Sequence, residues 1–225
     1  AAGALHRRRY ELNVSPEGLD SFLTRAAQGA VKGGSDDDRV RLLAAWGVDR
    51  LLLDRPLDTA AGVRPLAQLP SFGQSLWIYR ILAPAPELYL ARRVFPAPHL
   101  QAAVRRMVEP DFQAGNDVVV AGEGAPRANP GGSVRLLRSG PESLTAQVDS
   151  PQGSFLVIQR AHLPLWKAAI DGRNVEIEFA NLHRMGVAVP AGTHRVRFWV
   201  ERRPLAISGN TLADSPEWIL TAGAT

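Results

Sequence analysis

The sequence predicts an α+β, β-rich protein, in which a mixed α/β region over residues 1–124 is followed by an antiparallel β-sandwich over residues 133–203. Three observations support this fold class. Apolar residues recur at helical spacing in parts of the first region, whereas apolar and polar residues alternate in the second. Between the two regions, glycine and proline gather where neither helix nor strand is favoured. We therefore expect a linker over residues 125–132 and a C-terminal tail over residues 204–225.

The first region carries the helix signals. Residues 16–30 follow Ser15 as an N-cap, with proline at the first helical position. The run Asp36-Asp37-Asp38 precedes an apolar face that ends at Gly47, and residues 100–108 form a further helical segment. Three successive aspartates also suggest a calcium loop, but the alternating ligand spacing and the distal glutamate of such loops are missing. We interpret the run as helix capping and compensation of the helix dipole.

Strands are expected on both sides of the linker. Those of the first region span residues 48–53, 74–82, 88–94 and 117–121. Those of the second show the alternation of half-buried strands, over residues 144–149, 175–179 and 195–201. Residues 155–158 form a continuous apolar run, which indicates a central strand covered on both faces. The pair Asp171-Gly172 favours a type I′ hairpin, and the spacing of the turns is typical of a jelly-roll or carbohydrate-binding-module type of sandwich.

Composition narrows the functional classes. The chain has no cysteine, which excludes disulfides, thiolate metal sites and thiol nucleophiles. Lys plus Arg number 26 against 22 for Asp plus Glu, so the net charge is only +4 despite a pI near 10.1. So small a net positive charge argues against a nucleic-acid partner. We expect no signal peptide, and no apolar run reaches the roughly 20 residues that cross a bilayer.

The candidate binding residues surround one tryptophan. Trp166 follows Pro164 before the Asp-Gly turn, where an exposed indole would stack on the apolar face of a sugar or on a lipid headgroup. The alternative, which we favour, is that Trp166 fills the sandwich core. The polar candidates beside it are His162, His183 and Arg184.

The remaining polar residues predict no catalytic or metal site. His162, His183 and His194 lack the close pair spacing of zinc ligands. Asp171 and Glu176 suggest the paired carboxylates of glycoside chemistry, but the turn explains the first and the solvated face of a strand explains the second. We therefore predict no catalytic residue, no metal and no cofactor.

Residues 155–200 carry an ordered series of motifs. An apolar strand leads to Pro164-Leu165-Trp166-Lys167, then to a hairpin built on Asp171-Gly172, and then to the turn Pro190-Ala191-Gly192-Thr193-His194 before the last strand. This order resembles the C-terminal extracytoplasmic domain of YfhO-type bacterial membrane proteins. The upstream segment Trp46-Gly47-Val48-Asp49-Arg50 is similar to the same family more loosely.

The resemblance implies a parent protein with many membrane helices, similar to type-C glycosyltransferases that use lipid-linked sugars. This chain would lie on the periplasmic or cell-surface side, and the catalytic acid would lie in an early loop outside it. One departure stands out. After Arg203-Pro204 the family enters a membrane helix, whereas here the sequence continues into polar Ser208-Gly209-Asn210.

Two functions follow as expectations. The first is a non-catalytic extracytoplasmic accessory domain of a polytopic membrane glycosyltransferase-like protein, which binds a lipid-linked sugar or a glycan acceptor, or shields the active site. Its contact with the membrane would run through the parent protein. The alternative is a stand-alone carbohydrate-binding or adhesion module of β-sandwich type. An enzyme acting alone ranks third, because no group of residues supplies a nucleophile, a base and oxyanion donors together.

Overall fold

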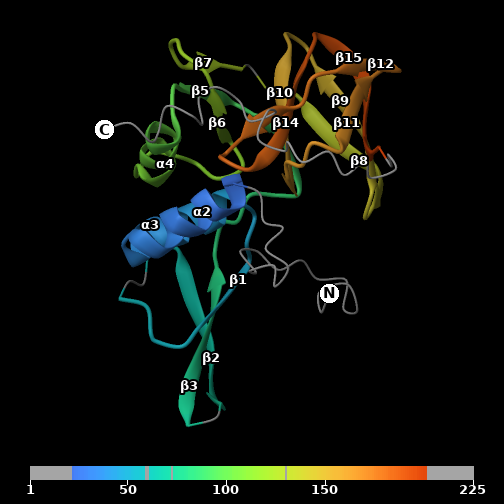
Figure 1. The fold of residues 1–225 in the computed structure, drawn as a ribbon. Coiled ribbons are helices and arrows are strands. Elements are labelled where there is room, and N and C mark those ends of the chain that lie inside the picture. Colours follow the sequence, from blue (N-terminus) through green and yellow to red (C-terminus); the bar gives the residue numbers. More distant parts are fainter. Residues whose placement is uncertain (1–21, 59–60, 72, 130, 202–225) are drawn as a thin grey trace, which may run out of the picture.

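A computed structural model describes residues 22–58, 61–71, 73–129 and 131–201. These residues form the helices α2, α3 and α4 and three β-sheets (Figure 1). Strand far outweighs helix, which confirms the predicted α+β, β-rich fold. The predicted N-cap Ser15, the start of the helix expected over 16–30 and the tail over 204–225 lie outside the described residues.

Capping residues precede two of the described helices, Ser35 before α3 and His99 before α4. α2 spans Phe22–Gly33, α3 spans Asp36–Ala45 and α4 spans Leu100–Val108. Ser35 and Asp38 form a reciprocal capping box, in which the Ser35 hydroxyl accepts from the Asp38 amide at 3.1 Å. The acidic run thus occupies the first turn of α3, as the capping interpretation predicts. The predicted bounds of α4 are confirmed at both ends.

A three-stranded antiparallel sheet in the order β1-β3-β2 packs beneath α2 and α3 and extends beyond them as a long hairpin (Figure 1). Its strands are β1 (Arg50–Leu53), β2 (Val63–Ser71) and β3 (Gln74–Ile81). The sequence did not predict β2, because Pro65 and Pro70 interrupt it. Both prolines are tolerated since β2 is an edge strand, which needs to donate on one side only.

A seven-stranded sheet has the order β4-β10-β14-β13-β6-β5-β7. β5 and β6 pair in parallel, and α4 lies between them in the chain as the crossover helix. The strands are β4 (Leu88–Ala91), β5 (Arg93–Ala97), β6 (Asp117–Ala121), β7 (Arg127–Ala128), β10 (Ser154–Ala161), β13 (Glu178–Ala180) and β14 (Arg184–Val189).

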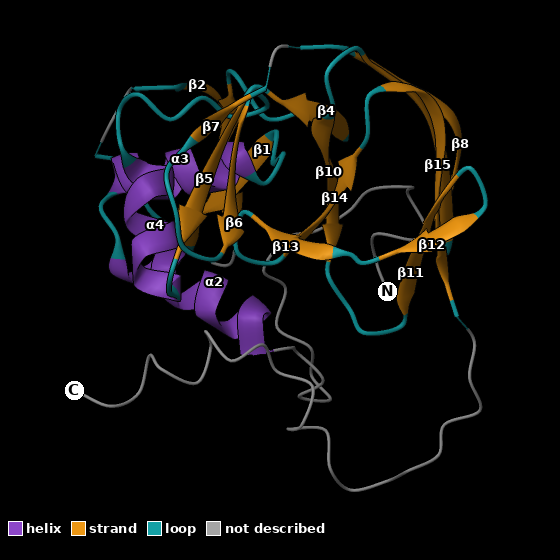
Figure 2. Ribbon diagram, turned by 90° about the horizontal axis from the view of Figure 1, so that it is seen from above, coloured by secondary structure: helices purple, strands orange, loops and turns teal. Residues whose placement is uncertain are grey.

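A five-stranded antiparallel sheet in the order β12-β11-β15-β9-β8 completes the sandwich (Figure 2). Its inner face packs against the β4-β10-β14 end of the seven-stranded sheet, and Phe198 and Leu156 are fully buried in the core between the two sheets. The strands are β8 (Ser133–Gly140), β9 (Ser143–Ser150), β11 (Trp166–Ile170), β12 (Arg173–Val175) and β15 (Gly192–Val200).

The sheets do not divide where the predicted linker lies. β7 falls within residues 125–132 and pairs with β5, and the seven-stranded sheet takes strands from both sides of this segment. The sandwich also includes β4, which precedes the segment. The glycines and prolines of this stretch therefore mark a connection within one sheet system, and the boundary at 125–132 does not separate two sheets.

Two predicted strands are each divided in the structure. Residues 88–94 form β4 and β5, because the backbone turns at Arg92, whose amide donates to the Asn116 carbonyl at 2.6 Å. Residues 175–179 are shared between β12 and β13, which belong to different sheets. The alternation continues through this crossing, so the sequence pattern alone does not reveal it.

Candidate functional site

The outer face of the five-stranded sheet is the best candidate site. Alternation along β15 turns Val196 and Phe198 into the sandwich core and leaves Arg195, Arg197 and Trp199 on the opposite face. Both arginines are exposed and Trp199 is half-buried. The long polar side chains therefore stand on the solvent side of a strand that lies at the centre of its sheet.

Short side chains on the neighbouring strands form the floor of a groove. Arg197 lies opposite Ala169 of β11 and Thr145 of β9, and Trp199 lies opposite Ser143 of β9. Because these neighbours are small, the longer side chains rise around a hollow of about 820 Å³. Its walls include Arg138, Asp171, Asn174, Arg195, Arg197 and Trp199. We call this hollow the outer groove.

The outer groove is cationic. Its lining contains Arg138, Arg195 and Arg197 against a single carboxylate, Asp171. The Arg197 guanidinium lies 5.2 Å from the centre of the Trp199 ring, close enough for a cation–π contact. Guanidinium groups donate to phosphate and to hydroxyl oxygens, and the indole offers an apolar face. The groove thus combines the donor set and the aromatic surface that a sugar or sugar phosphate requires.

Asp171 is fixed at the end of the outer groove. Its carboxylate accepts from the Arg195 amide at 2.8 Å and lies 2.7 Å from Nδ1 of His194. The hydrogen bond from the Arg195 amide lowers the pKa of Asp171 most, and the hydrogen bond with His194 lowers it further. The same bond raises the pKa of His194. Asp171 has φ 49° and Gly172 has φ 82°, as the predicted type I′ hairpin between β11 and β12 requires. The carboxylate therefore stays ionised and locks the turn.

Trp166, the main sequence candidate, faces the opposite side of its sheet. It is 8% exposed and packs within the sandwich core, with the Arg160 guanidinium 5.6 Å from its ring centre. This is the arrangement that the sequence analysis favoured over an exposed platform. The aromatic residue on the solvent side of the sheet is Trp199, which was not predicted from the sequence. The sequence does contain the evidence for it. Trp199 lies two residues after Arg197 and four after Arg195, so alternation places it on the same face of the strand as these two arginines.

The three polar candidates lie near one another, with His183 and Arg184 buried and His162 partly buried. The His162 amide donates to the His183 carbonyl at 2.8 Å, and Arg184 donates through Nη2 to the Trp46 carbonyl at 2.8 Å. The His183 ring packs edge-on against Trp46 at 4.7 Å. Burial lowers the pKa of His162, whose ring lies 4.0 Å from that of Phe179. His183 and Arg184 are buried, so this cluster joins the end of α3 to the sheet instead of facing a ligand.

A buried polar network continues from Trp46 through the molecule. Asn181 accepts from Trp46 Nε1 on its carbonyl and from the Val119 amide on its side chain, each at 2.9 Å. Its Nδ2 donates to the Tyr89 hydroxyl, which donates to the Asp117 carbonyl. Burial raises the pKa of Tyr89, so the phenol remains protonated and keeps donating. Asn181 has φ 46°, in the left-handed region that asparagine adopts more readily than most residues, and its side chain is held there by Val119 and Tyr89.

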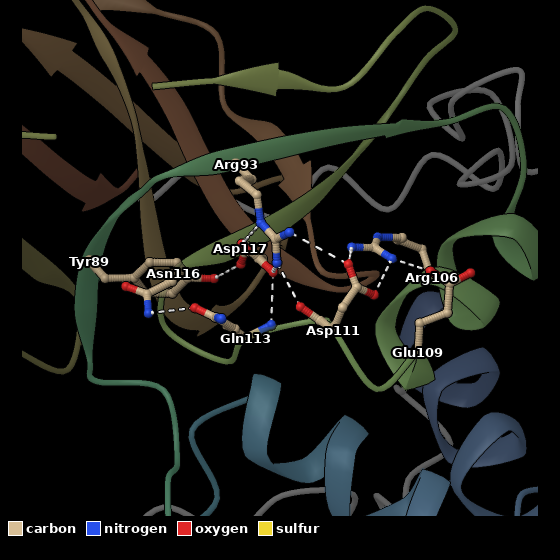
Figure 3. Close-up of polar contacts among 8 residues, drawn as sticks. All are labelled: Tyr89, Arg93, Arg106, Glu109, Asp111, Gln113, Asn116 and Asp117. Atoms are coloured by element: carbon tan, nitrogen blue, oxygen red, sulfur yellow. Dashed lines mark hydrogen bonds and ion pairs between the residues drawn. The ribbon is translucent and has the colours of Figure 1, made fainter. Parts of the chain in front are cut away.

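A group of charged residues adjoins this network (Figure 3). Arg93 binds both carboxylate oxygens of Asp117, at 2.8 and 2.6 Å, and also the Asp111 carbonyl at 2.6 Å. Arg106 contacts Asp111 and Glu109, and it lowers the pKa of Asp111. The Asp111 carboxylate is therefore held in its ionised form by Arg106, and Asp117 and Glu109 each form an ion pair with an arginine. The group clamps α4 to β5 and β6.

A second hollow, of about 490 Å³, lies between α3, the end of β3 and residues 107–116. Its lining is mostly apolar, including Val40, Ile81, Met107 and Phe112, with Asp37 and Arg41 at its rim. It lacks the array of guanidinium donors found in the outer groove. Among the described residues, no three histidine, aspartate or glutamate side chains gather closely enough to hold a metal ion.

No family model, curated protein or solved structure matches this chain. Within the described part of the chain, no helix is long and apolar enough to cross a membrane. The arguments about function below therefore rest on the residues and their geometry.

Proposed function

We propose that this chain is a non-catalytic extracytoplasmic accessory module of a polytopic membrane glycosyltransferase-like protein, and that it holds a lipid-linked sugar or glycan acceptor in the outer groove. The single observation that carries the proposal is the pairing of Trp199 with Arg197 at the centre of this groove. The motifs over residues 155–200, which resemble the YfhO-type domain, support the placement outside the cytoplasm.

The chemistry of the groove supports a sugar phosphate. A pyranose presents an apolar face that stacks on an indole, and its hydroxyl groups accept from guanidinium donors. A phosphate takes two parallel hydrogen bonds from one arginine, and the groove holds three arginines against one aspartate. Its volume of about 820 Å³ lies within the usual range for small-ligand sites, roughly 300–1,000 Å³.

The alternative function, a stand-alone carbohydrate-binding or adhesion module, would use the same groove on a neutral glycan. The open outer face of an antiparallel sandwich favours it, because such a face can accept an extended oligosaccharide without rearrangement. The two functions differ in their need for phosphate. We favour the first because the groove carries a surplus of positive charge.

Titration calorimetry tests the proposal with a short-chain polyprenyl-phosphate sugar and with the same sugar lacking phosphate. We expect saturable binding of the phosphorylated sugar, weakened roughly tenfold by Trp199→Ala because one stacking contact is lost. The melting temperature of this variant should stay close to that of the wild type, since Trp199 lies on the outer face of the sheet.

Trp166→Ala is the matched control, because it removes the same side chain from the same sheet on its buried face. It should lower the free energy of unfolding by roughly 3–5 kcal/mol, as for other buried aromatic residues. Equal binding of both sugars would favour the stand-alone glycan module. Binding that is absent, or that survives Trp199→Ala unchanged, would contradict the outer groove as the site.

A further inference from the structure

The three-stranded sheet has one covered face and one open face. Register places Leu51 opposite Tyr79 and Leu53 opposite Trp77, and these side chains pack with α2 and α3 in one core. Side chains one residue away point to the other face, because successive residues of a strand alternate. Among the described residues, the helices cover the first face only (Figure 1).

A row of three arginines crosses the open face. Arg80 of β3 lies directly opposite Arg50 of β1 and also directly opposite Arg64 of β2. All three side chains are exposed. Like charges placed directly across strands destabilise a sheet. An acidic neighbour is Asp49, whose carboxylate lies 3.6 Å from Nε of Arg50, so the row keeps a net positive charge.

The same face becomes apolar toward the end of the hairpin. Two residues beyond the arginine row, Leu52 lies opposite Ile78, and two residues further, Leu69 lies opposite Leu76. Leu52 is 60% exposed and Leu69 is 47% exposed. At about 3.4 Å per residue, these two layers stand roughly 7 and 14 Å from the arginine row.

We propose that this face of the β1-β3-β2 sheet docks on an anionic lipid bilayer. The arginine row binds the phosphate headgroups, and Leu52 and Leu69 enter the interface between the headgroups and the acyl chains. The arginine row and the leucines share one face, so they can contact the bilayer together, as in interfacial binding, where apolar side chains enter the boundary between headgroups and acyl chains. Charge complementarity favours an anionic surface over a neutral one.

A bilayer explains both halves of the face, whereas other occupants explain only one. A nucleic acid or an acidic peptide would engage the arginines but would leave the leucines in water. The open face of the β1-β3-β2 sheet and the outer groove are separate surfaces, since they belong to different sheets. Variants of one can therefore be compared with variants of the other in the same protein.

The experiment measures co-sedimentation of the full chain with vesicles of phosphatidylcholine alone and of equal parts phosphatidylcholine and phosphatidylglycerol. We expect binding to the anionic vesicles only. Arg80→Glu should weaken it roughly thirtyfold, because it removes two units of charge and each contributes about fivefold near a charged surface. The same change places a glutamate between Arg50 and Arg64, so the folded state should be as stable as the wild type or more stable.

Arg105→Glu on α4 is the matched control, since it changes the charge equally at an exposed site away from the sheet. It should leave vesicle binding within about twofold of the wild type. Leu69→Ser should weaken binding about tenfold, because an inserted leucine no longer leaves water.

Three results would overturn the proposal. The first is no binding of the wild type to the anionic vesicles. The second is equal loss for Arg80→Glu and Arg105→Glu, which would mean attraction through overall charge. The third is binding that Arg80→Glu abolishes and Leu69→Ser leaves unchanged, which would indicate a soluble polyanion as the natural occupant.

Discussion

Asp36 is a buried carboxylate that fixes a loop to the start of α3. It accepts from Arg55 at 2.9 and 2.6 Å and from the Asp58 amide at 2.8 Å, and it also pairs with Arg39. The bond from Arg55 outweighs desolvation and lowers the pKa of Asp36 from 3.8 to about 2. The aspartates that the sequence shows as one run thus have different roles, because Asp38 caps the helix and Asp36 holds residues 55–58.

Asp36→Asn should lower the free energy of unfolding relative to the wild type by more at neutral pH than in acid. A carboxyl group whose pKa is lowered on folding stabilises the protein above its unfolded pKa of 3.8, and that contribution is lost as the pH falls through about 2. We expect the substitution to lower the free energy of unfolding by about 1 kcal/mol at pH 7. This is less than the pKa shift of Asp36 implies, because solvent screens the half-exposed Arg55. Urea unfolding at several pH values measures the difference.

Asp37→Asn is the control for this prediction. Asp37 lies in the same first turn but is exposed. Its replacement should change the free energy of unfolding by a few tenths of a kcal/mol at most, as for a surface charge near a helix start. A gap between Asp36→Asn and the wild type that stays constant from neutral to acid pH would show that the carboxylate charge contributes nothing.

The sequence predicts which residues are buried better than it predicts what they contact. The core role of Trp166 follows from its place before the hairpin, and the structure places it in the core. Asn181 gave no such signal, although it connects Trp46, Val119 and Tyr89. Its partners lie up to 135 positions away in the chain. Contacts of this range depend on the arrangement of the sheets, which local patterns do not contain.

At the scale of single elements, Gly186 of β14 leaves room for the Phe155 ring of the neighbouring strand β10. A Cβ atom added there would clash with the ring of Phe155 and would lie 3.2 Å from the Leu156 carbonyl oxygen. The Phe155 ring is buried, so it has little room to move. Glycine at this position lets a large aromatic ring pack over the neighbouring strand.

Gly186→Ala should therefore destabilise the protein by roughly 1–3 kcal/mol, the usual range for overpacking a core. At about 2–4 °C per kcal/mol for a chain of this size, the melting temperature should fall by roughly 2–12 °C. Adding Phe155→Leu removes the clashing ring atoms. The double variant should be no less stable than Phe155→Leu alone, and differential scanning calorimetry measures all three.

Gly29→Ala is the matched glycine control. No atom lies within 4 Å of the position that its Cβ would occupy, and it sits in the interior of α2. Alanine should stabilise this helix by roughly 0.5–1 kcal/mol, because it loses less backbone entropy than glycine. If Gly186→Ala behaved in the same way, the Phe155 ring would not limit the side chain at that position.

Local patterns predict elements well where one element matches one pattern. Residues 100–108 became α4 and residues 117–121 became β6 with the predicted bounds. The apolar run over 155–158 lies within β10, whose side chains contribute to cores on both of its faces, as predicted. The failures share a physical cause. β12 and β13 continue one alternation while changing sheets, and alternation specifies which side of a strand is buried but not which sheet buries it.

At the scale of the whole molecule, the seven-stranded sheet interleaves early and late parts of the chain. β4 pairs with β10, and β6 pairs with β13, so strands from before residue 124 flank strands from after residue 150 (Figure 2). Composition predicts a break over 125–132, and glycine and proline there do connect two strands. Whether such a connection joins two domains or two strands of one sheet depends on long-range pairing, which a turn signal does not encode.

This interleaving predicts that the fragment over residues 133–203 does not fold alone. Without β4, the edge of β10 from Phe155 to Ile158 loses its hydrogen-bonding partners, and Phe155 and Val157 lose the cover of Tyr89 and Val118. An unpaired apolar edge of this kind promotes aggregation. We expect the isolated fragment to show no cooperative thermal transition by circular dichroism.

The full chain provides the complementary test. A protease site inserted after Gly124, an exposed position with no atom within 4 Å of its would-be Cβ, allows the folded protein to be cut between β6 and β7. The two halves should stay together in gel filtration, because the pairings of β4 with β10 and of β6 with β13 hold them. Separation of the halves, with the later half melting cooperatively, would mean that the sandwich is an independent domain and that the interleaved strands contribute little to its stability.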